Sequence, residues 1–134
     1  MVKEYRSESL ERTLRTLHLA VPGIIASVIV NIDGLLVSAY PPGDDDDNYT
    51  DNPTSSPQVA AMAATLIGLA ERTLGRLDQG ELGRLLMEGE KGVMIVYPAG
   101  RAALAVLVAN NVKMGKVLYA TSRARNDVVR ILGG

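Results

Sequence analysis

The segment Val28–Asp47, VIVNIDGLLVSAYPPGDDDD, decides the fold because it holds two apolar runs separated by a tight turn. Asp33-Gly34 is a turn dipeptide, since glycine accepts the positive φ that a short hairpin requires. The flanking residues are therefore predicted to form two antiparallel strands. Pro41-Pro42 ends the second strand, because proline donates no hydrogen bond to the ladder. The four aspartates at 44–47 raise the question of a metal site, a catalytic loop or a solvated tether.

The composition indicates a single domain with an aliphatic core. Of the 134 residues 47% are hydrophobic, and both Phe and Trp are absent. A net charge of −1 argues against general affinity for nucleic acid, which requires a large positive excess. The first residues are charged and show no signal region, and the longest apolar run, Val59–Ala70, is too short to span a membrane. We therefore expect a cytoplasmic protein.

Eight segments with helix or strand character follow one another in the order α-β-β-α-β-β-β-α. Strands joined by hairpins are antiparallel, so the predicted fold class is α/β (α+β) with a five-stranded, mostly antiparallel sheet. Three strands are apolar at nearly every position, which indicates cover on both faces. We predict a three-layer α/β/α sandwich in one domain, 1–134, with the middle helix on one face and the terminal helices on the other. The expected elements are helices 3–19, 58–77 and 113–132 and strands 24–30, 35–40, 81–88, 92–97 and 102–109.

The sequence contains no recognisable catalytic or metal-binding pattern. His18 is the only histidine, and a lone helical histidine is expected to be a surface or packing residue rather than a general base, which needs a partner. A calcium-binding EF-hand loop beginning at Asp44 would place Tyr49 and Ser55 where Gly and a bidentate acid are required. The acidic loop at 43–57 is therefore expected to be a solvated tether. We predict no catalytic residue, no cofactor and no metal.

The middle helix is apolar nearly all round, with Thr65 as the single polar residue between positions 59 and 70. One apolar stripe is enough to cover a sheet, and the larger residues are expected to supply it, namely Met62, Leu66, Ile67, Leu69 and Leu74. Small residues recur every four positions on another side, where they would let a second helix come close. An exposed apolar helix face usually marks an interface, so we predict a homodimer. The alternative is that the acidic loop folds over this face, although it has almost nothing apolar to offer.

The sheet edges lead to the same expectation. The strand ending SAYPP is blunted by proline and followed by negative charge, whereas the strand ELGRLLMEG has no proline. A second copy that pairs with ELGRLLMEG would continue the sheet across a two-fold axis. The expected dimer-interface residues are Ala60, Ala64, Thr65, Gly68, Leu85 and Met87.

The chain resembles the Roadblock domain family, the dynein light chain Roadblock family, over about residues 8–130. The resemblance rests on the element order and on four segments in sequence: IIASVIVNIDGLLVSA, VAAMAATLIGLAERTLGRL, ELGRLLMEGEKGVMIVYPAGRAALAVLVA and NVKMGKVLYATSRA. It implies a Roadblock/profilin-like fold and a non-enzymatic module that dimerises through the middle helix and third strand. Bacterial relatives of the mutual gliding motility type imply regulation of a small Ras-like GTPase. The acidic loop at 43–57 is longer than this pattern suggests.

Polar residues near the expected dimer helices are the candidates for contact with such a GTPase. They are Gln58, Arg72 and Arg76, of which the two arginines lie one helical turn apart. For each of them a solvated or locally paired charge is the alternative. A basic line on the last helix (Lys116, Arg123 and Arg130) is a second candidate surface for a partner or an anionic membrane. A different class, a ligand-sensing domain of the PAS or GAF type, also places helices around an antiparallel sheet, but its pocket favours aromatic lining.

Overall fold

The computed structural model describes residues 2–42 and 57–133 and has the predicted element order. Most of the expected acidic loop, including the four aspartates, lies outside the described residues. None of the described helices combines the length and apolar character needed to cross a membrane. The elements are α1 (Val2–Ala20), β1 (Ile24–Asn31), β2 (Leu36–Tyr40), α2 (Pro57–Arg76), β3 (Leu85–Glu88), β4 (Gly92–Ala99), β5 (Ala102–Ala109) and α3 (Met114–Leu132).

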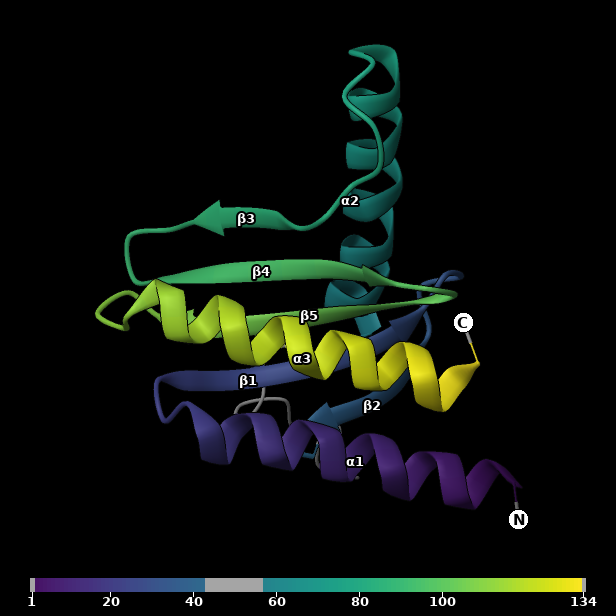
Figure 1. The fold of residues 1–134 in the computed structure, drawn as a ribbon, viewed down its shortest axis with the longest axis vertical. Helices are drawn as coiled ribbons and strands as arrows, with labels where there is room; N and C mark the ends of the chain where they lie inside the picture. The colour runs from purple at the N-terminus through teal and green to yellow at the C-terminus, as the bar shows by residue number, and fades with distance from the viewer. Residues whose placement is uncertain (1, 43–56, 134) are drawn as a thin grey trace.

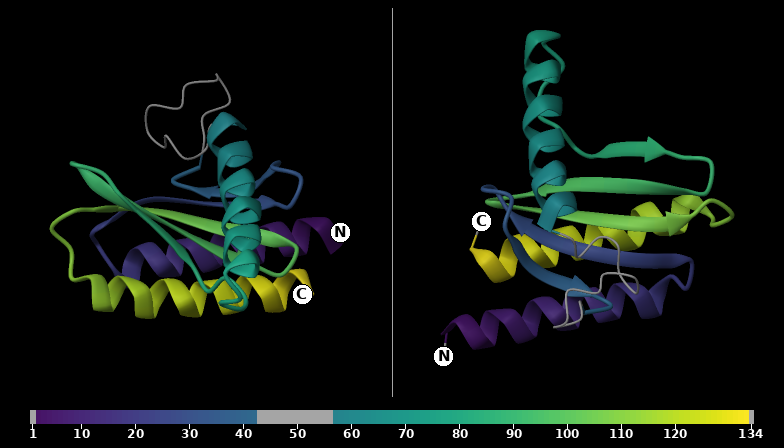
Figure 2. Two further views of the ribbon diagram at one scale, coloured as in Figure 1. Left: turned by 90° about the horizontal axis from the view of Figure 1, so that it is seen from above. Right: turned by 180° about the vertical axis from the view of Figure 1, so that it is seen from behind.

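The five strands form one antiparallel sheet in the order β2-β1-β5-β4-β3, which confirms the predicted fold class. Both edge strands are the ones expected from the sequence, β2 before the two prolines and β3 in the segment ELGRLLMEG. Figures 1 and 2 show three layers, with α1 and α3 on one face of the sheet and α2 on the other. The cover on both faces explains why the central strands are apolar throughout.

The predicted third strand, 81–88, is corrected at its start, because β3 begins at Leu85. The link before it contains Asp78 with a φ of 57° and Gly80 with a φ of 88°. Both values lie in the left-handed region, which an extended strand does not use. The link closes α2 by hydrogen bonds from the Asp78 and Gln79 amides to the Gly75 and Leu74 carbonyls, a common helix ending.

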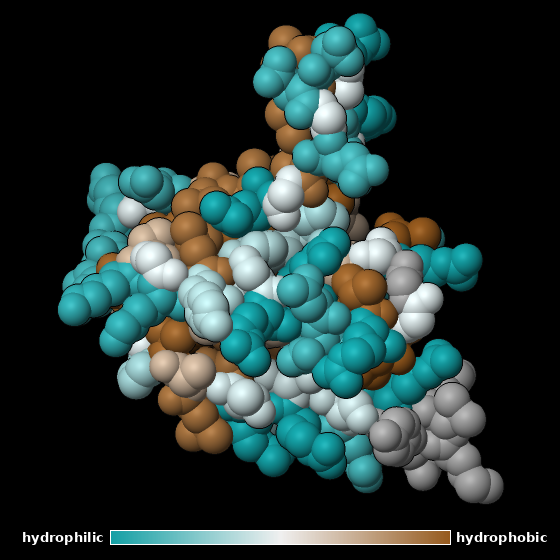
Figure 3. Space-filling view, in the orientation of Figure 1, coloured by the Kyte–Doolittle hydropathy of each residue, from teal (hydrophilic) through white to brown (hydrophobic). Residues whose placement is uncertain are grey.

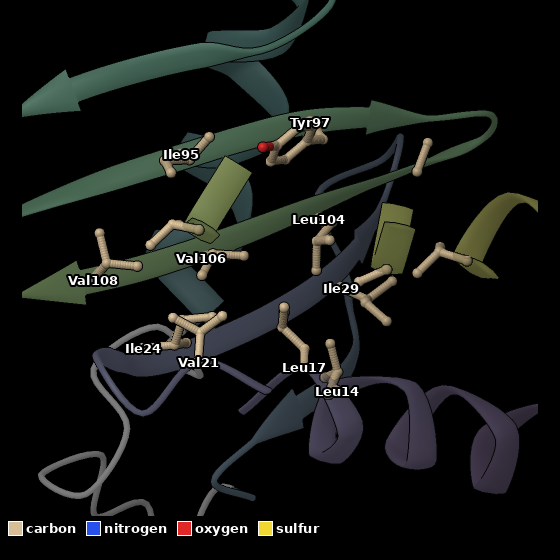
Figure 4. Close-up of a cluster of buried hydrophobic side chains, with 14 of the residues drawn as sticks. Leu14, Leu17, Val21, Ile24, Ile29, Ile95, Tyr97, Leu104, Val106 and Val108 are labelled. Carbon is tan, nitrogen blue, oxygen red and sulfur yellow. The ribbon is translucent and has the colours of Figure 1, made fainter. Parts of the chain in front are cut away.

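The larger core lies between the sheet and the α1/α3 layer. Leucines of α1 meet side chains of β1, β4 and β5 there, as Figure 4 shows for Leu14, Leu17 and Leu104. Within this apolar core the Tyr97 hydroxyl lies 2.5 Å from the Thr121 hydroxyl, which also donates to the Val117 carbonyl. The Tyr97 and Thr121 hydroxyls therefore satisfy each other inside the core.

The smaller core lies between the sheet and α2 and is built from small side chains. Ala60 and Ala63 are fully buried against a cluster that includes Ala103 and Ala105 of β5. Alanine on alanine lets the helix backbone approach the sheet closely. The structure thus corrects the expected faces of the helix, because the small residues face the sheet while Met62, 62% exposed, faces solvent.

Candidate partner-binding surface on helix α2 and strand β3

Helix α2 crosses the sheet and then extends well past the β3 edge (Figures 1 and 2). Its fully buried residues, Ala60 and Ala63, both lie in the first half. The second half, Leu66–Arg76, is called the projecting half below. Its Leu69 side chain is 53% exposed. A helix that leaves the sheet in this way keeps an apolar side without cover from its own chain, which is typical of an interaction surface.

An apolar groove runs along the projecting half. It has a volume of about 410 Å³ and lies between α2 and the link that leads into β3. The link contributes Leu82 and Arg84, and β3 contributes Leu85. The remaining lining residues, all from α2, are Leu66, Leu69, Ala70, Thr73 and Leu74. The helix and the edge strand therefore form one continuous surface.

Strand β3 forms the rim of this surface. It pairs with β4 alone among the described strands, so one of its backbone edges faces away from the sheet. Leu85 and Met87 pair with Val96 and Met94, and Met87 packs with the small core under α2. The free edge of a short strand without proline is open to a further strand.

The structure places the expected dimer-interface residues in several different environments. Ala60 is fully buried on the sheet, so its assignment to a helix–helix contact is wrong. Ala64 and Gly68 are partly buried and line a small hollow between α2 and the ends of β1, β4 and β5. Thr65 is exposed, and its hydroxyl donates to the Ala61 carbonyl. Leu85 and Met87 lie on the β3 surface described above. The interface itself stays a prediction.

Sequence reasoning missed the apolar side of the projecting half because residue size was used to assign the faces. The spacing of Ala60, Ala63 and Ile67 is a regular helical stripe, and these residues do contact the sheet cluster. A stripe of small residues can pack on a sheet of alanines as well as on a second helix. Once that stripe is placed on the sheet, Met62 and Leu69 must fall on the open side.

The three candidate contact residues for a GTPase lie on one helix but not together. Arg72 and Arg76 are exposed on the projecting half, and Gln58 is exposed at the first turn of α2. At 1.5 Å per residue, Gln58 and Arg72 are about 21 Å apart along the helix axis. Within one copy of the chain these residues therefore form two sites rather than one.

His18 is a packing residue, as expected. Its Nε2 lies 2.9 Å from the Ser27 hydroxyl of β1, and its ring packs at 4.6 Å between centroids on Tyr40 of β2. Partial burial lowers the pKa of His18 to about 4. The neutral ring therefore ties the end of α1 to the sheet.

The chain belongs to the Roadblock/LC7 domain family, whose pattern matches residues 11–109. Domains of this family are in general non-enzymatic regulatory or adaptor modules. The match places the chain in the Roadblock class and sets aside the PAS or GAF alternative. An uncharacterized protein of Methanocaldococcus jannaschii, MJ0310, is 32% identical over 106 residues, which cover 79% of this chain and 85% of that protein.

Solved structures agree with the fold. The Roadblock/LC7 domain from Streptomyces avermitilis superposes with a TM-score of 0.78 at 24% identity, over 92% of this chain and 98% of that chain. MglB of Myxococcus xanthus superposes with a TM-score of 0.77 at 17% identity, over 92% and 94%. The expected relation to profilin is seen at a TM-score of 0.57 and 10% identity with Acanthamoeba castellanii profilin IB, over 84% and 90%.

Proposed function

We propose that this protein is a homodimeric, non-enzymatic Roadblock module that binds a small Ras-like GTPase and regulates or scaffolds it. The observation that carries the proposal is the projecting half of α2 beside the free edge of β3. Both features present unsatisfied surface at the same end of the molecule, the helix an apolar face and the strand a backbone edge. A second copy can satisfy both at once.

The geometry of such a dimer follows from the pairing of β3 with itself. Antiparallel pairing of identical strands places the two-fold axis perpendicular to the sheet, so both α2 helices lie on the same face. The projecting half of each copy then covers the α2 side of its neighbour's sheet, where Met87 and Met94 are partly buried. Next to Met94, Leu107 and Ile25 line a further hollow of about 550 Å³. Helix and sheet would thus complete each other reciprocally.

This arrangement also brings the candidate contact residues together. Figure 1 shows β3 beside the middle of α2. The two-fold axis would make the α2 helices of the two copies run antiparallel. The Gln58 end of one helix therefore comes near the Arg72 and Arg76 end of the other. A GTPase surface with acidic groups could contact the arginines of one copy and the first helical turn of its neighbour.

The partner class comes from the family. A dimer of this kind acts by binding, and the resemblance to Roadblock proteins of the mutual gliding motility type implies a Ras-like GTPase as the target. The fold likeness to MglB of Myxococcus xanthus is consistent with this proposal. A binding affinity that depends on the nucleotide state supports a regulator, and an affinity that does not depend on it supports a scaffold.

The test is a calorimetric titration of a Ras-like GTPase captured from native lysate, loaded in turn with GDP and with a non-hydrolysable GTP analogue. We expect binding that differs between the two states, which supports a regulator, whereas equal binding supports a scaffold. Reversing two exposed charges with Arg72→Glu and Arg76→Glu should weaken binding about tenfold. Arg15→Glu, at an exposed arginine of α1 far from α2, is the matched control and should leave binding unchanged. Failure to capture any Ras-like GTPase, or unchanged binding by the double variant, would contradict the partner or the site.

A further inference from the structure

A second groove lies on the opposite face of the molecule, between α1 and α3. Its wider part has a volume of about 640 Å³ and is lined on one side by Thr13, Thr16, Leu17 and Ala20 of α1 and by Val21 just after it. A narrower part of about 460 Å³ continues toward Ser9 and shares Thr13, Thr16 and Asp127 with the first. The two parts form one channel, called the α1/α3 groove below. From Ser9 to Ala20 it is about 17 Å long, which is three helical turns.

The charges around this groove are almost all positive. Arg12, Lys116, Arg123 and Arg130 line it, and Asp127 is the acidic residue among its lining. Asp127 pairs with Arg130 at 2.7 Å and also attracts Arg123, so the lining of the groove holds four cations against one acidic residue.

The charged residues are unevenly distributed over the whole chain, and the groove lies in the basic part. Residues 2–20 and 113–132, which form the α1/α3 layer with the cap of α3, hold nine Lys or Arg and four Asp or Glu, whereas the rest holds five and eleven. Figure 3, which faces this layer, shows hydrophilic residues gathered over it. A chain with a net charge of −1 therefore presents one basic face.

The groove also has an apolar floor and an aromatic anchor. Ala20 and Ala120 form its accessible apolar surface, above the buried Leu17, Val21 and Ala124. Tyr119 is 62% exposed on the rim, where Arg123 donates a hydrogen bond of 3.0 Å to its hydroxyl. Tyrosine and arginine are the side chains most enriched among residues that dominate binding energy in protein interfaces.

We propose that the α1/α3 groove is a docking site for an acidic amphipathic helix of a partner protein. A helix of about three turns fits the length of the groove and can place an apolar stripe on its floor. Acidic residues flanking that stripe would meet Arg12 and Arg130 at one end and Lys116 and Arg123 at the other. A flat anionic lipid surface would meet the basic rim but would leave the floor uncovered. This site lies on the face opposite α2 and is independent of the proposed GTPase contact.

The probe is a synthetic helical peptide of about 14 residues, with leucines three and four positions apart and glutamates beside them. Fluorescence anisotropy should show one peptide per chain, with an affinity that falls as salt rises. The double variant Lys116→Glu/Arg123→Glu should lose about tenfold in affinity, because two attractive contacts become repulsive. Thr16→Trp, on the exposed rim, should block the groove while leaving these charges in place. Arg101→Glu, at an exposed arginine in the turn between β4 and β5, is the control that should bind the peptide normally.

Two further probes make the assignment specific. A peptide of the same composition with its leucines scrambled should bind at least tenfold more weakly, because it cannot place a stripe on the floor. Equal binding of both peptides, or full binding by the Lys116→Glu/Arg123→Glu variant, would overturn the proposal. Binding to vesicles containing phosphatidylserine without binding to the peptide would also overturn it and assign the face to lipid.

Discussion

At the scale of single residues, His18 shows how burial and hydrogen bonding set the charge of one side chain. Its Nε2 is 2.9 Å from Ser27 Oγ, and Ser27 is fully buried, so protonation would bring a charge to the edge of the core. Burial accordingly lowers the pKa of His18 from 6.5 to about 4. The sequence predicted a surface or packing role for this lone helical histidine, and the structure gives it the packing role. It could not predict the pKa, because Ser27 and Tyr40 are brought to the ring only by the sheet.

This pKa leads to a pH-dependent stability. The unfolded chain binds a proton at His18 below about pH 6.5, whereas the folded chain binds it only near pH 4. The contribution of neutral His18 is therefore full above about pH 6.5 and is lost as pH falls toward 4. We expect the free energy of unfolding to fall over this window by more in the wild type than in His18→Gln, which does not titrate. Urea unfolding at a series of fixed pH values measures this free energy. If it falls equally with pH in the wild type and in His18→Gln, the prediction is contradicted.

At the scale of secondary-structure elements, the sequence predicted most of the fold because its signals are local. Asp33-Gly34, the two prolines after β2 and the apolar strands specify the hairpin, the sheet edge and the covered faces. The orientation of α2 could not be predicted in the same way. Apolar residues surround this helix, so the choice of face depends on the alanines of β5, which accept Ala60 and Ala63. The exposure of Leu69 then results from the helix extending past β3, which is a property of the assembled sheet.

The corrected orientation of α2 can be tested by two substitutions of small residues. Ala63 is fully buried on the sheet, so Ala63→Leu should overpack the core and lower the free energy of unfolding by about 1–3 kcal/mol. A Cβ at Gly68 would meet no atom within 4 Å, so Gly68→Ala should raise it by about 0.5–1 kcal/mol through helix propensity. Chemical denaturation of both variants at one protein concentration gives the comparison. An almost unchanged free energy of unfolding in Ala63→Leu would mean that this side of α2 is not packed on the sheet.

At the scale of the whole molecule, the two helical layers have different surfaces. On one face α2 presents an apolar projecting half beside a free strand edge, which suits a second copy of the same chain. On the other face α1 and α3 form a basic groove with an apolar floor. The family match identifies the module, and the pairing of two copies through the first face is our proposal. The second face depends on individual charges such as Lys116 and Arg123, whose spacing on α3 the sequence showed but whose groove only the packing of α1 creates.

The proposed dimer gives the last prediction, which concerns mass and thermal stability together. Association through α2 and β3 should give twice the chain mass of 14.3 kDa in sedimentation equilibrium. It should also make the unfolding midpoint rise with protein concentration, because dissociation accompanies unfolding. Leu69→Glu would place a charge in the apolar contact between copies and should shift the protein to monomer at micromolar concentration. Leu19→Glu, at a leucine 78% exposed on α1, is the matched control and should remain dimeric. A wild-type monomer, or an unaltered dimer in Leu69→Glu, would show that the projecting half of α2 does not join two copies.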